Sequence, residues 1–245
     1  GPTYVALGDS RAAGPLIEFS EHRDLCLRSP DLNYPAKLAR LIGAATVIDV
    51  TCSAAKPAHV ISTPQFVGTG FAPPPQIDAL RPDTDVVTLS IGGGRFQSPA
   101  RVGALRRRRS RRRCRLPQQP TGGAAHGRGG SRRWRPQVDA VVAAIVAKAP
   151  NAEVYLIGHG GSVGRRGCWP NLPVSDADAV WLERYFARFN QIYAQAAARY
   201  GVHYVDIATA AVDGGHDAAR RRDSDGSRAS CRSHPPNRHT PTRSR

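Results

Sequence analysis

The chain has 245 residues and a formal net charge of +16 at pH 7, and its length is sufficient for one α/β domain with a sizeable core. No run of eighteen apolar residues occurs, so the sequence predicts no membrane-spanning helix. The positive charge lies in two places: residues 95–135 contain fourteen arginines and no acid, and residues 220–245 contain eight arginines and two aspartates. The remaining residues are mildly acidic, which argues against a nucleic-acid-binding surface on the folded body.

Apolar runs alternate along the chain with segments of helical periodicity. The apolar runs predict five strands, at residues 3–8, 45–52, 85–93, 152–158 and 203–207. Helices are expected between them at 34–42, 137–148 and 175–200, with Asn33 and Ser175 as N-caps and Pro136 in the first turn of the second helix. This alternation predicts a three-layer α/β/α domain around a parallel sheet of about five strands, as in flavodoxin-like folds.

The two arginine-rich segments interrupt this alternation. Neither has enough apolar surface to offset the entropy of ordering it. We therefore expect a single domain over residues 1–219, with 95–135 as an insert or loop and 220–245 as an irregular tail. Segments of this composition also arise when GC-rich DNA is translated in a wrong reading frame. A frame shift over 94–135 and 219–245 is a hypothesis that intact-protein mass and peptide mapping would test.

Three loops of small residues follow predicted strands. They are Gly8-Asp9-Ser10, Thr51-Cys52-Ser53 and Gly92-Gly93-Gly94. Because parallel strands end at one edge of a sheet, where ligands collect, we expect these loops to converge on one crevice. A serine just past a strand end is exposed there, and its own amide can point at the oxygen of a bound acyl group. Ser10 is therefore the candidate nucleophile, although a bare Gly-Asp-Ser also occurs in ordinary turns.

Residues 4–14, Tyr-Val-Ala-Leu-Gly-Asp-Ser-Arg-Ala-Ala-Gly, resemble the first block of the GDSL/SGNH hydrolases, in which this serine is the nucleophile. Residues 49–55 resemble the second block of the family, and residues 87–93 the approach to the third. The resemblance covers residues 3–94 and 136–219. It implies an SGNH-hydrolase fold and an esterase or lipase that acts through an acyl-enzyme on a small acyl ester or lipid. It implies no metal or organic cofactor, and we expect a monomer with no nucleic-acid partner.

The resemblance also assigns the other catalytic groups. The oxyanion hole is expected at Ser10, Ala54 and Gly94. Ala54 stands where the family has glycine, whose positive-φ geometry alanine resists. Gly94 stands where the family has an asparagine, and loss of such a donor typically costs about 10²–10³ in kcat. The general base is expected at His234, in the only His-Pro pair of the chain, with Cys231 instead of an aspartate three residues earlier.

Cysteine and histidine spacing argues against a metal site. The five cysteines include no C-x-x-C pair, and their wide spacing fits either long-range disulfides or buried thiols. The histidines at 59, 126, 159, 203 and 216 show no ligand spacing and are expected to be ordinary surface or hydrogen-bonded residues.

The resemblance extends to secreted actinobacterial members of the family, in which cysteines at the positions of Cys26 and Cys52 form a disulfide. It therefore implies that pairing here, and an exported protein whose signal peptide has been removed. Cys168 also fits this subgroup, with Cys231 as a substitute partner.

Three other interpretations stay open. Residues 160–164 match the G-x-S-x-G of a nucleophile elbow centred on Ser162, although the sequence after it is a poor helix start. Residues 106–113 would allow polyanion or nucleic-acid binding, although no aromatic side chains are interleaved. The third interpretation is a catalytically impaired relative that keeps the fold. It rests on Gly94 in place of the asparagine and on the missing aspartate before His234.

Overall fold

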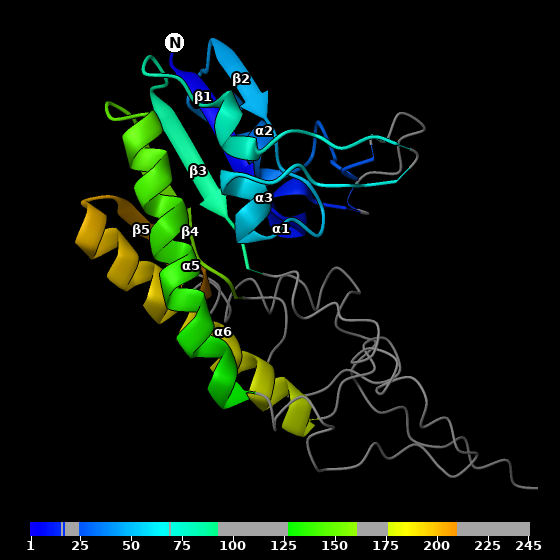
Figure 1. Cartoon of the computed structure of the whole chain (residues 1–245), viewed down its shortest axis with the longest axis vertical. Helices are drawn as coiled ribbons and strands as arrows, with labels where there is room; N and C mark the ends of the chain where they lie inside the picture. Colours follow the sequence, from blue (N-terminus) through cyan, green and yellow to red (C-terminus); the bar gives the residue numbers. More distant parts are fainter. Residues whose placement is uncertain (16, 18–24, 69, 93–126, 161–175, 210–245) are drawn as a thin grey trace, which may run out of the picture.

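Five parallel strands form a single sheet in the order β2-β1-β3-β4-β5 (Figure 1). The computed structural model describes residues 1–15, 17, 25–68, 70–92, 127–160 and 176–209. The strands are β1 (Thr3–Gly8), β2 (Thr46–Asp49), β3 (Val86–Ser90), β4 (Glu153–Ile157) and β5 (His203–Val205). The predicted parallel sheet is therefore confirmed.

The two central strands are buried almost throughout. In β1 and β3 every residue after the first is buried, and the register pairs Val5 with Val87 and Leu7 with Leu89. Such continuous apolar runs are required where helices cover both faces of a sheet. The outer strand β2 is half-exposed and shorter than its predicted range, although the amides of Val50 and Cys52 still donate to carbonyls of β1.

Helices cover both faces of the sheet. On one face α2 (Tyr34–Leu41) buries Ala39 against Tyr4 and Ala6. On the other face lie α3 (Pro57–Ile61), α5 (Gly127–Lys148) and α6 (Asp176–Tyr200), which share one core with β1, β3 and β4. The chain leaves β1 toward β2 and later crosses back toward β5, so right-handed crossovers place these helices on opposite faces. None of the described helices combines the length and apolarity needed to cross a membrane.

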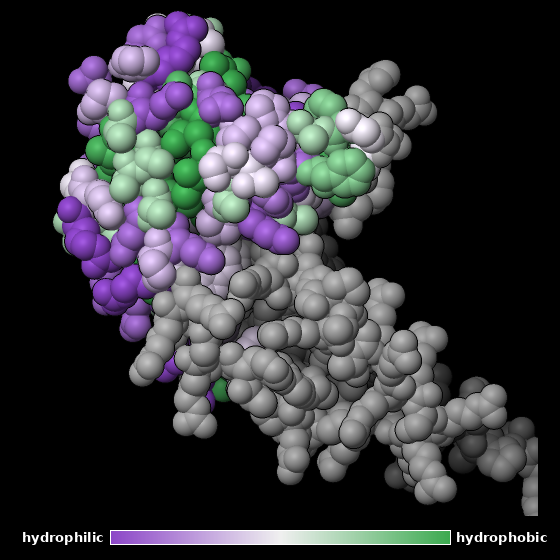
Figure 2. All heavy atoms as spheres, viewed as in Figure 1, coloured by the Kyte–Doolittle hydropathy of each residue, from purple (hydrophilic) through white to green (hydrophobic). Residues whose placement is uncertain are grey.

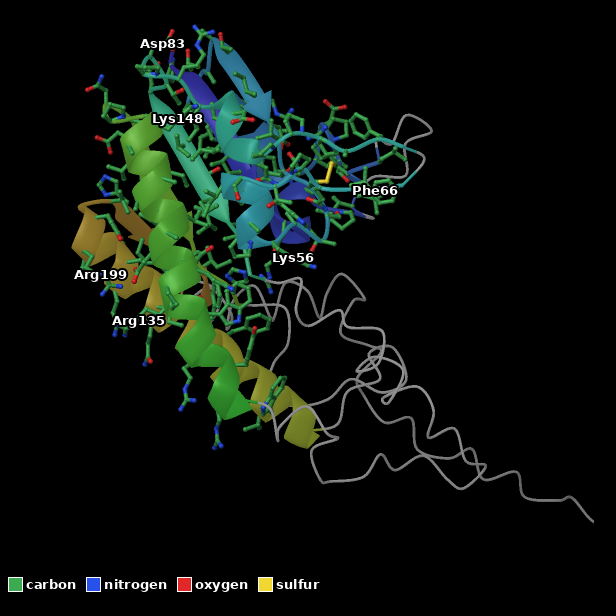
Figure 3. All side chains as sticks on the ribbon, viewed as in Figure 1. Lys56, Phe66, Asp83, Arg135, Lys148 and Arg199 are labelled. Atoms are coloured by element: carbon green, nitrogen blue, oxygen red, sulfur yellow. A yellow bond between two sulfur atoms is a disulfide. The ribbon has the colours of Figure 1, made fainter. Side chains whose placement is uncertain are left out.

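The helix ends follow the sequence in part. Asn33 caps α2 as predicted, and its side-chain oxygen accepts a hydrogen bond from the Ala36 amide at 2.9 Å. Helix α6 ends at Tyr200 as predicted, and the expected cap Ser175 lies outside the described residues. Arg199 of α6, labelled in Figure 3, donates to Asp139 of α5 at 2.7 Å.

Helix α5 begins ten residues earlier than predicted, at Gly127. The expectation of Pro136 in its first turn is therefore wrong, and so is that of an irregular chain up to residue 135. Trp134 explains the extension, because its ring is 5% exposed and packs edge-on against Phe189 of α6 with centroids 5.3 Å apart. Burial of this side chain and its contact with Phe189 favour the helical conformation around Pro136, which opposes it by removing a backbone donor. The other expectations for 95–126 and 220–245 concern residues outside the described part.

Candidate active site

Asp9 joins the ends of the two central strands. Its backbone amide donates to the Ser90 carbonyl at 2.9 Å, and its side-chain Oδ2 accepts from the Gly92 amide at 2.9 Å. Its Oδ1 accepts from the Arg11 amide at 3.0 Å and so caps the short helix α1 (Ser10–Ala13). The buried carboxylate therefore fixes the backbone of Ser10 between β1 and β3.

Ser10 lies where the order of the sheet reverses. The chain leaves β1 toward β2 on one side, and β3 leads to β4 on the other. In sheets of this order, ligands bind outside the carboxyl ends of the strands at this switch point. Ser10 is half-buried there, at the strand end where the sequence predicted it. Its catalytic role stays a prediction.

Gly8 and Gln76 hold the backbone directly before the serine. Gly8 has φ +152°, and a Cβ there would lie 2.4 Å from the Ser90 carbonyl oxygen. The buried Gln76 amide binds both backbone groups of Gly8: its Oε1 accepts from the amide at 2.8 Å, and its Nε2 donates to the carbonyl at 2.9 Å. Sequence reasoning missed Gln76, because its partner is 68 residues away and no local pattern marks it.

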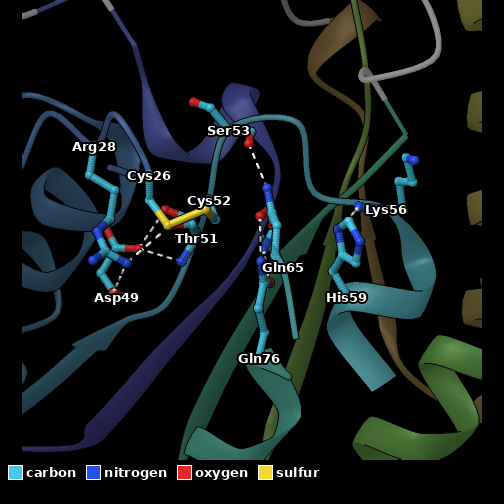
Figure 4. The surroundings of a disulfide bond; sticks show 11 residues. Cys26, Arg28, Asp49, Thr51, Cys52, Ser53, Lys56, His59, Gln65 and Gln76 are labelled. Carbon is cyan, nitrogen blue, oxygen red and sulfur yellow. Dashed lines mark hydrogen bonds between the residues drawn. A yellow bond between two sulfur atoms is a disulfide. The ribbon is translucent and has the colours of Figure 1, made fainter. Parts of the chain in front are cut away.

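The second loop is held by a backbone hydrogen bond to the first loop, and by a disulfide and a further hydrogen bond to the segment around Cys26 (Figure 4). Cys26 and Cys52 are bonded, with Cα atoms 4.3 Å apart, so the predicted pairing is confirmed. The Cys52 amide donates to the Gly8 carbonyl at 3.0 Å, and the Ser53 amide donates to the Cys26 carbonyl at 2.9 Å. Gln65 Nε2 donates to the Ser53 carbonyl at 2.8 Å. Three segments far apart in sequence thus lie side by side next to Ser53.

A polar network fixes the start of this loop. Asp49 Oδ1 accepts from the Thr51 amide at 3.0 Å and from the Thr51 hydroxyl at 2.6 Å, and its Oδ2 accepts from Asn33 Nδ2 at 2.8 Å. The Arg28 guanidinium donates to the carbonyls of Asp49 and Thr51 at 2.9 and 3.1 Å. The conformation of the following turn is therefore imposed from several sides.

Ala54 adopts the left-handed conformation within this turn, with φ +68°. A non-glycine residue pays about 1–2 kcal/mol for this region. The sequence suggested that alanine would resist such a geometry. The chain adopts it because the Ala55 amide closes the turn on the Cys52 carbonyl at 3.0 Å and Cys52 is held by the disulfide.

β4 leads into a buried histidine. His159 is 1% exposed, and the Asn190 amide holds its backbone: the His159 amide donates to Oδ1 at 2.7 Å, and Nδ2 donates to the His159 carbonyl at 2.6 Å. Neither ring nitrogen has a hydrogen-bond partner within the described part of the chain. Burial, with a smaller contribution from the positive charge of Arg11, lowers the pKa of His159 to about 3. The expectation of an ordinary surface or hydrogen-bonded histidine is therefore wrong at this position.

Aromatic rings surround His159. Its ring stacks on Phe186 with centroids 5.9 Å apart, and Phe189 and Tyr193 lie at 4.6 and 5.8 Å. Arg11 reaches the same group, with Cζ 5.0 Å from the centroid of the Phe186 ring. Burial lowers the pKa of Arg11, and the charge of Asp9 opposes that change.

The other predicted site residues lie outside the described part of the chain. They are Gly94, His234, Ser162, Cys168, Cys231 and residues 106–113. The structure therefore brings together Ser10 and the turn that contains Ala54, and the roles of the other residues stay predictions. No cluster of three or more metal-ligating side chains occurs among the described residues.

Similarity to known proteins identifies the family. The model of the GDSL-like lipase/acylhydrolase family matches residues 6–238. Lipase 2 of Streptomyces coelicolor is 31% identical over 226 residues, which cover 88% of this chain and 72% of that protein. The chain belongs to the GDSL-like lipase/acylhydrolase family. As a GDSL hydrolase it is an enzyme that cleaves carboxylic esters, and neither match supports a nucleic-acid-binding function.

Solved structures share the fold of this GDSL hydrolase. Phospholipase A1 from Streptomyces albidoflavus superposes with a TM-score of 0.63 at 24% identity, over 85% of this chain and 80% of that one. An extracellular lipase from Streptomyces rimosus superposes with a TM-score of 0.64 at 22% identity, over 85% and 81%. The three-layer α/β/α arrangement is thus common to all three chains.

Proposed function

We propose that Ser10 is the nucleophile of this GDSL hydrolase. Its Oγ attacks the ester carbonyl carbon, the alcohol leaves, and water then hydrolyses the acyl-enzyme. One observation carries the proposal: Asp9 holds Ser10 between the carboxyl ends of β1 and β3, at the switch point of the sheet.

Backbone amides stabilise the oxyanion that forms during the attack. Ser10 and Ala54 donate their N–H groups, and Gly94 completes the site. The φ of +68° at Ala54 supports this assignment, because it is a geometry that glycine takes freely and alanine takes only when the fold imposes it. Alanine keeps the N–H donor that the chemistry needs.

His234 is the general base, which takes the proton from Ser10 and returns it to the leaving alcohol. His159 is unsuited to this role. A general base works best with a pKa near the operating pH, and burial lowers the pKa of His159 to about 3.

The substrate is an acyl ester or lipid, degraded outside the cell. Phe66 and Phe71 are 72% and 50% exposed on the loop between α3 and the 3-10 turn η1 (Gln76–Ala79), so both present apolar surface. Phe66 is labelled in Figure 3, and Figure 2 shows hydrophobic atoms on this part of the surface. The hydrogen bond from Gln65 to the Ser53 carbonyl holds this loop next to the turn that contains Ala54. The apolar acyl chain of a substrate could therefore pack against these phenylalanines. The Cys26–Cys52 disulfide supports export, because disulfides persist in oxidising compartments. The enzyme acts as a monomer with one domain over residues 1–219.

Replacement of the serine tests this function. Ser10→Ala removes the attacking oxygen, and we expect kcat on p-nitrophenyl butyrate to fall by about 10⁴–10⁶-fold with the fold intact by circular dichroism. Ser62→Ala, at an exposed position after α3, is the matched control and keeps the wild-type rate. Full activity of Ser10→Ala together with loss of activity in Ser162→Ala would contradict the proposal and identify Ser162, in residues 160–164, as the nucleophile.

A further inference from the structure

Three buried side chains bind the backbone at the carboxyl ends of strands. Hydrogen bonds between strands stop where a strand ends, so buried backbone groups there need another partner. Each of these side chains binds both the amide and the carbonyl of one residue. The pairs are Gln76 with Gly8 at the end of β1, Tyr193 with Ile91 after β3, and Asn190 with His159 after β4.

Tyr193 makes the connection that spans the most sequence. It lies on α6, 102 residues from Ile91, and both residues are fully buried. Its hydroxyl oxygen accepts a hydrogen bond from the Ile91 amide at 2.9 Å, and the hydroxyl donates to the Ile91 carbonyl at 2.7 Å. Burial raises the pKa of Tyr193, so the hydroxyl keeps the proton that it donates. A phenylalanine here would fill the same space and remove this partner from both backbone groups of Ile91.

The backbone that Tyr193 holds leads directly to the proposed nucleophile. Gly92 follows Ile91, and its amide donates to Asp9 Oδ2 at 2.9 Å. Asp9 precedes Ser10 and caps the helix that begins there. A shift of the peptide between Ile91 and Gly92 would therefore move the carboxylate that fixes the backbone of Ser10.

Helix α6 restricts the same peptide by a second contact. Phe189 lies one turn before Tyr193, and their rings pack with centroids 4.8 Å apart. A Cβ on Gly92, which has φ +129°, would fall 2.3 Å from the Phe189 ring. Glycine is therefore required for this close approach, and α6 holds the end of β3 on the side away from β1.

We propose that Tyr193 is a positioning residue for ester hydrolysis. By holding both backbone groups of Ile91, it fixes the amide that Gly92 donates to Asp9. This hydrogen bond in turn sets where the hydroxyl and the amide of Ser10 lie. The proposal rests on the proposed role of Ser10 as nucleophile. Because Tyr193 is fully buried, it acts on the alignment of the attack and not on the binding of substrate.

Removal of the hydroxyl tests this role. In Tyr193→Phe we expect kcat on p-nitrophenyl butyrate to fall by about 10–100-fold, because misplacing reacting groups by about 1 Å slows a reaction this much. KM should stay within about twofold of the wild type, since the lost interaction aligns the transition state. The second-order rate constant of fluorophosphonate labelling at Ser10 should fall by a similar factor.

Tyr4→Phe is the matched control for a merely structural effect. Tyr4 is equally buried, and its hydroxyl is hydrogen-bonded to Thr88 at 2.8 Å, but it packs with α2 on the other face of the sheet. Both variants should lower the urea midpoint of unfolding, whereas Tyr4→Phe should keep the wild-type kcat and labelling rate. The same relative kcat in the two variants would overturn the proposal.

Two further outcomes keep this role separate from that of the nucleophile. Absence of a label on Ser10 in the wild type would refute the nucleophile itself. A Ser10 that is labelled in Tyr193→Phe as fast as in the wild type would overturn the role of Tyr193 alone.

Amide hydrogen exchange in the wild type decides the case if Tyr193→Phe does not fold. We expect the amides of Ile91 and Gly92 to exchange as slowly as those of β3, because the hydroxyl and Asp9 hold them. Exchange more than about tenfold faster than in β3 would show that Tyr193 does not fix this backbone, and would overturn the proposal.

Discussion

Ala54 combines a strained backbone with a position in the proposed oxyanion hole. Its φ of +68° destabilises the folded state by about 1–2 kcal/mol relative to glycine at this position. Glycine also adds about 0.4–1 kcal/mol of entropy to the unfolded chain. We therefore expect Ala54→Gly to raise the free energy of unfolding by about 0.5–1 kcal/mol in urea denaturation.

Ala58→Gly is the control for this prediction, because Ala58 lies exposed within α3. Glycine inside a helix costs about 1 kcal/mol, so this variant should change stability in the opposite direction. If Ala54→Gly destabilises as much as Ala58→Gly, the fold does not impose the left-handed conformation.

The lowered pKa of His159 makes the free energy of unfolding depend on pH. Its pKa is about 3 in the folded protein against 6.5 for an ordinary histidine, so below pH 6.5 the unfolded chain takes up a proton that the folded chain does not. The free energy of unfolding therefore falls as pH falls, and by pH 5 this histidine contributes a loss of about 2 kcal/mol. In His159→Phe we expect the loss between pH 7 and pH 5 to be smaller by about this amount, measured in urea at both pH values. Parallel losses in the two proteins would contradict the assignment.

The positions of single residues were predictable where a local sequence pattern sets them. Ser10 follows a strand with small neighbours, and Asn33 caps the helix next to it. The contacts of Gln76 and His159 were not predictable. Gln76 binds Gly8, 68 residues away, and His159 binds Asn190, 31 residues away. Nothing within a few positions of either residue indicates the contact that defines it.

At the scale of elements, the disulfide holds the oxyanion turn against the loop before α2. It spans 26 residues, and closing a loop of this length stabilises the folded state by about 3 kcal/mol through the entropy of the unfolded chain. We expect the double variant Cys26→Ser/Cys52→Ser to lose about this much free energy of unfolding, together with part of its kcat. Dithiothreitol should lower the free energy of unfolding of the wild type by at least this amount more than that of the variant. If the wild type and the double variant have the same free energy of unfolding without dithiothreitol, the Cys26–Cys52 disulfide does not stabilise the fold.

Strands and helices were predicted well where periodicity alone decides them. Buried apolar runs identified all five strands, and Asn33 located the start of α2. The start of α5 was misplaced because it depends on the packing of Trp134 against Phe189 of another helix. The tertiary packing of Trp134 outweighs the local preference of Pro136 for the first turn of a helix.

At the scale of the whole molecule, alternation of strands and helices predicted the parallel sheet, and the crossover rule accounts for which helices lie on each face. The order β2-β1-β3-β4-β5 puts the switch point beside Ser10, which no short stretch of sequence contains. The position of Ser10 at the carboxyl end of a strand was therefore predictable from β1 and its following turn, and its catalytic role stays a prediction. Gly94 and His234 stay predictions, since they lie outside the described residues.

Fluorophosphonate labelling of the purified protein, followed by peptide mass spectrometry, tests the central claim most directly, because the probe reacts only with an activated nucleophile. We predict one label, on the peptide that contains Ser10, together with turnover of p-nitrophenyl acetate that the label abolishes. A label on Ser162, or no label and no turnover, would contradict the account.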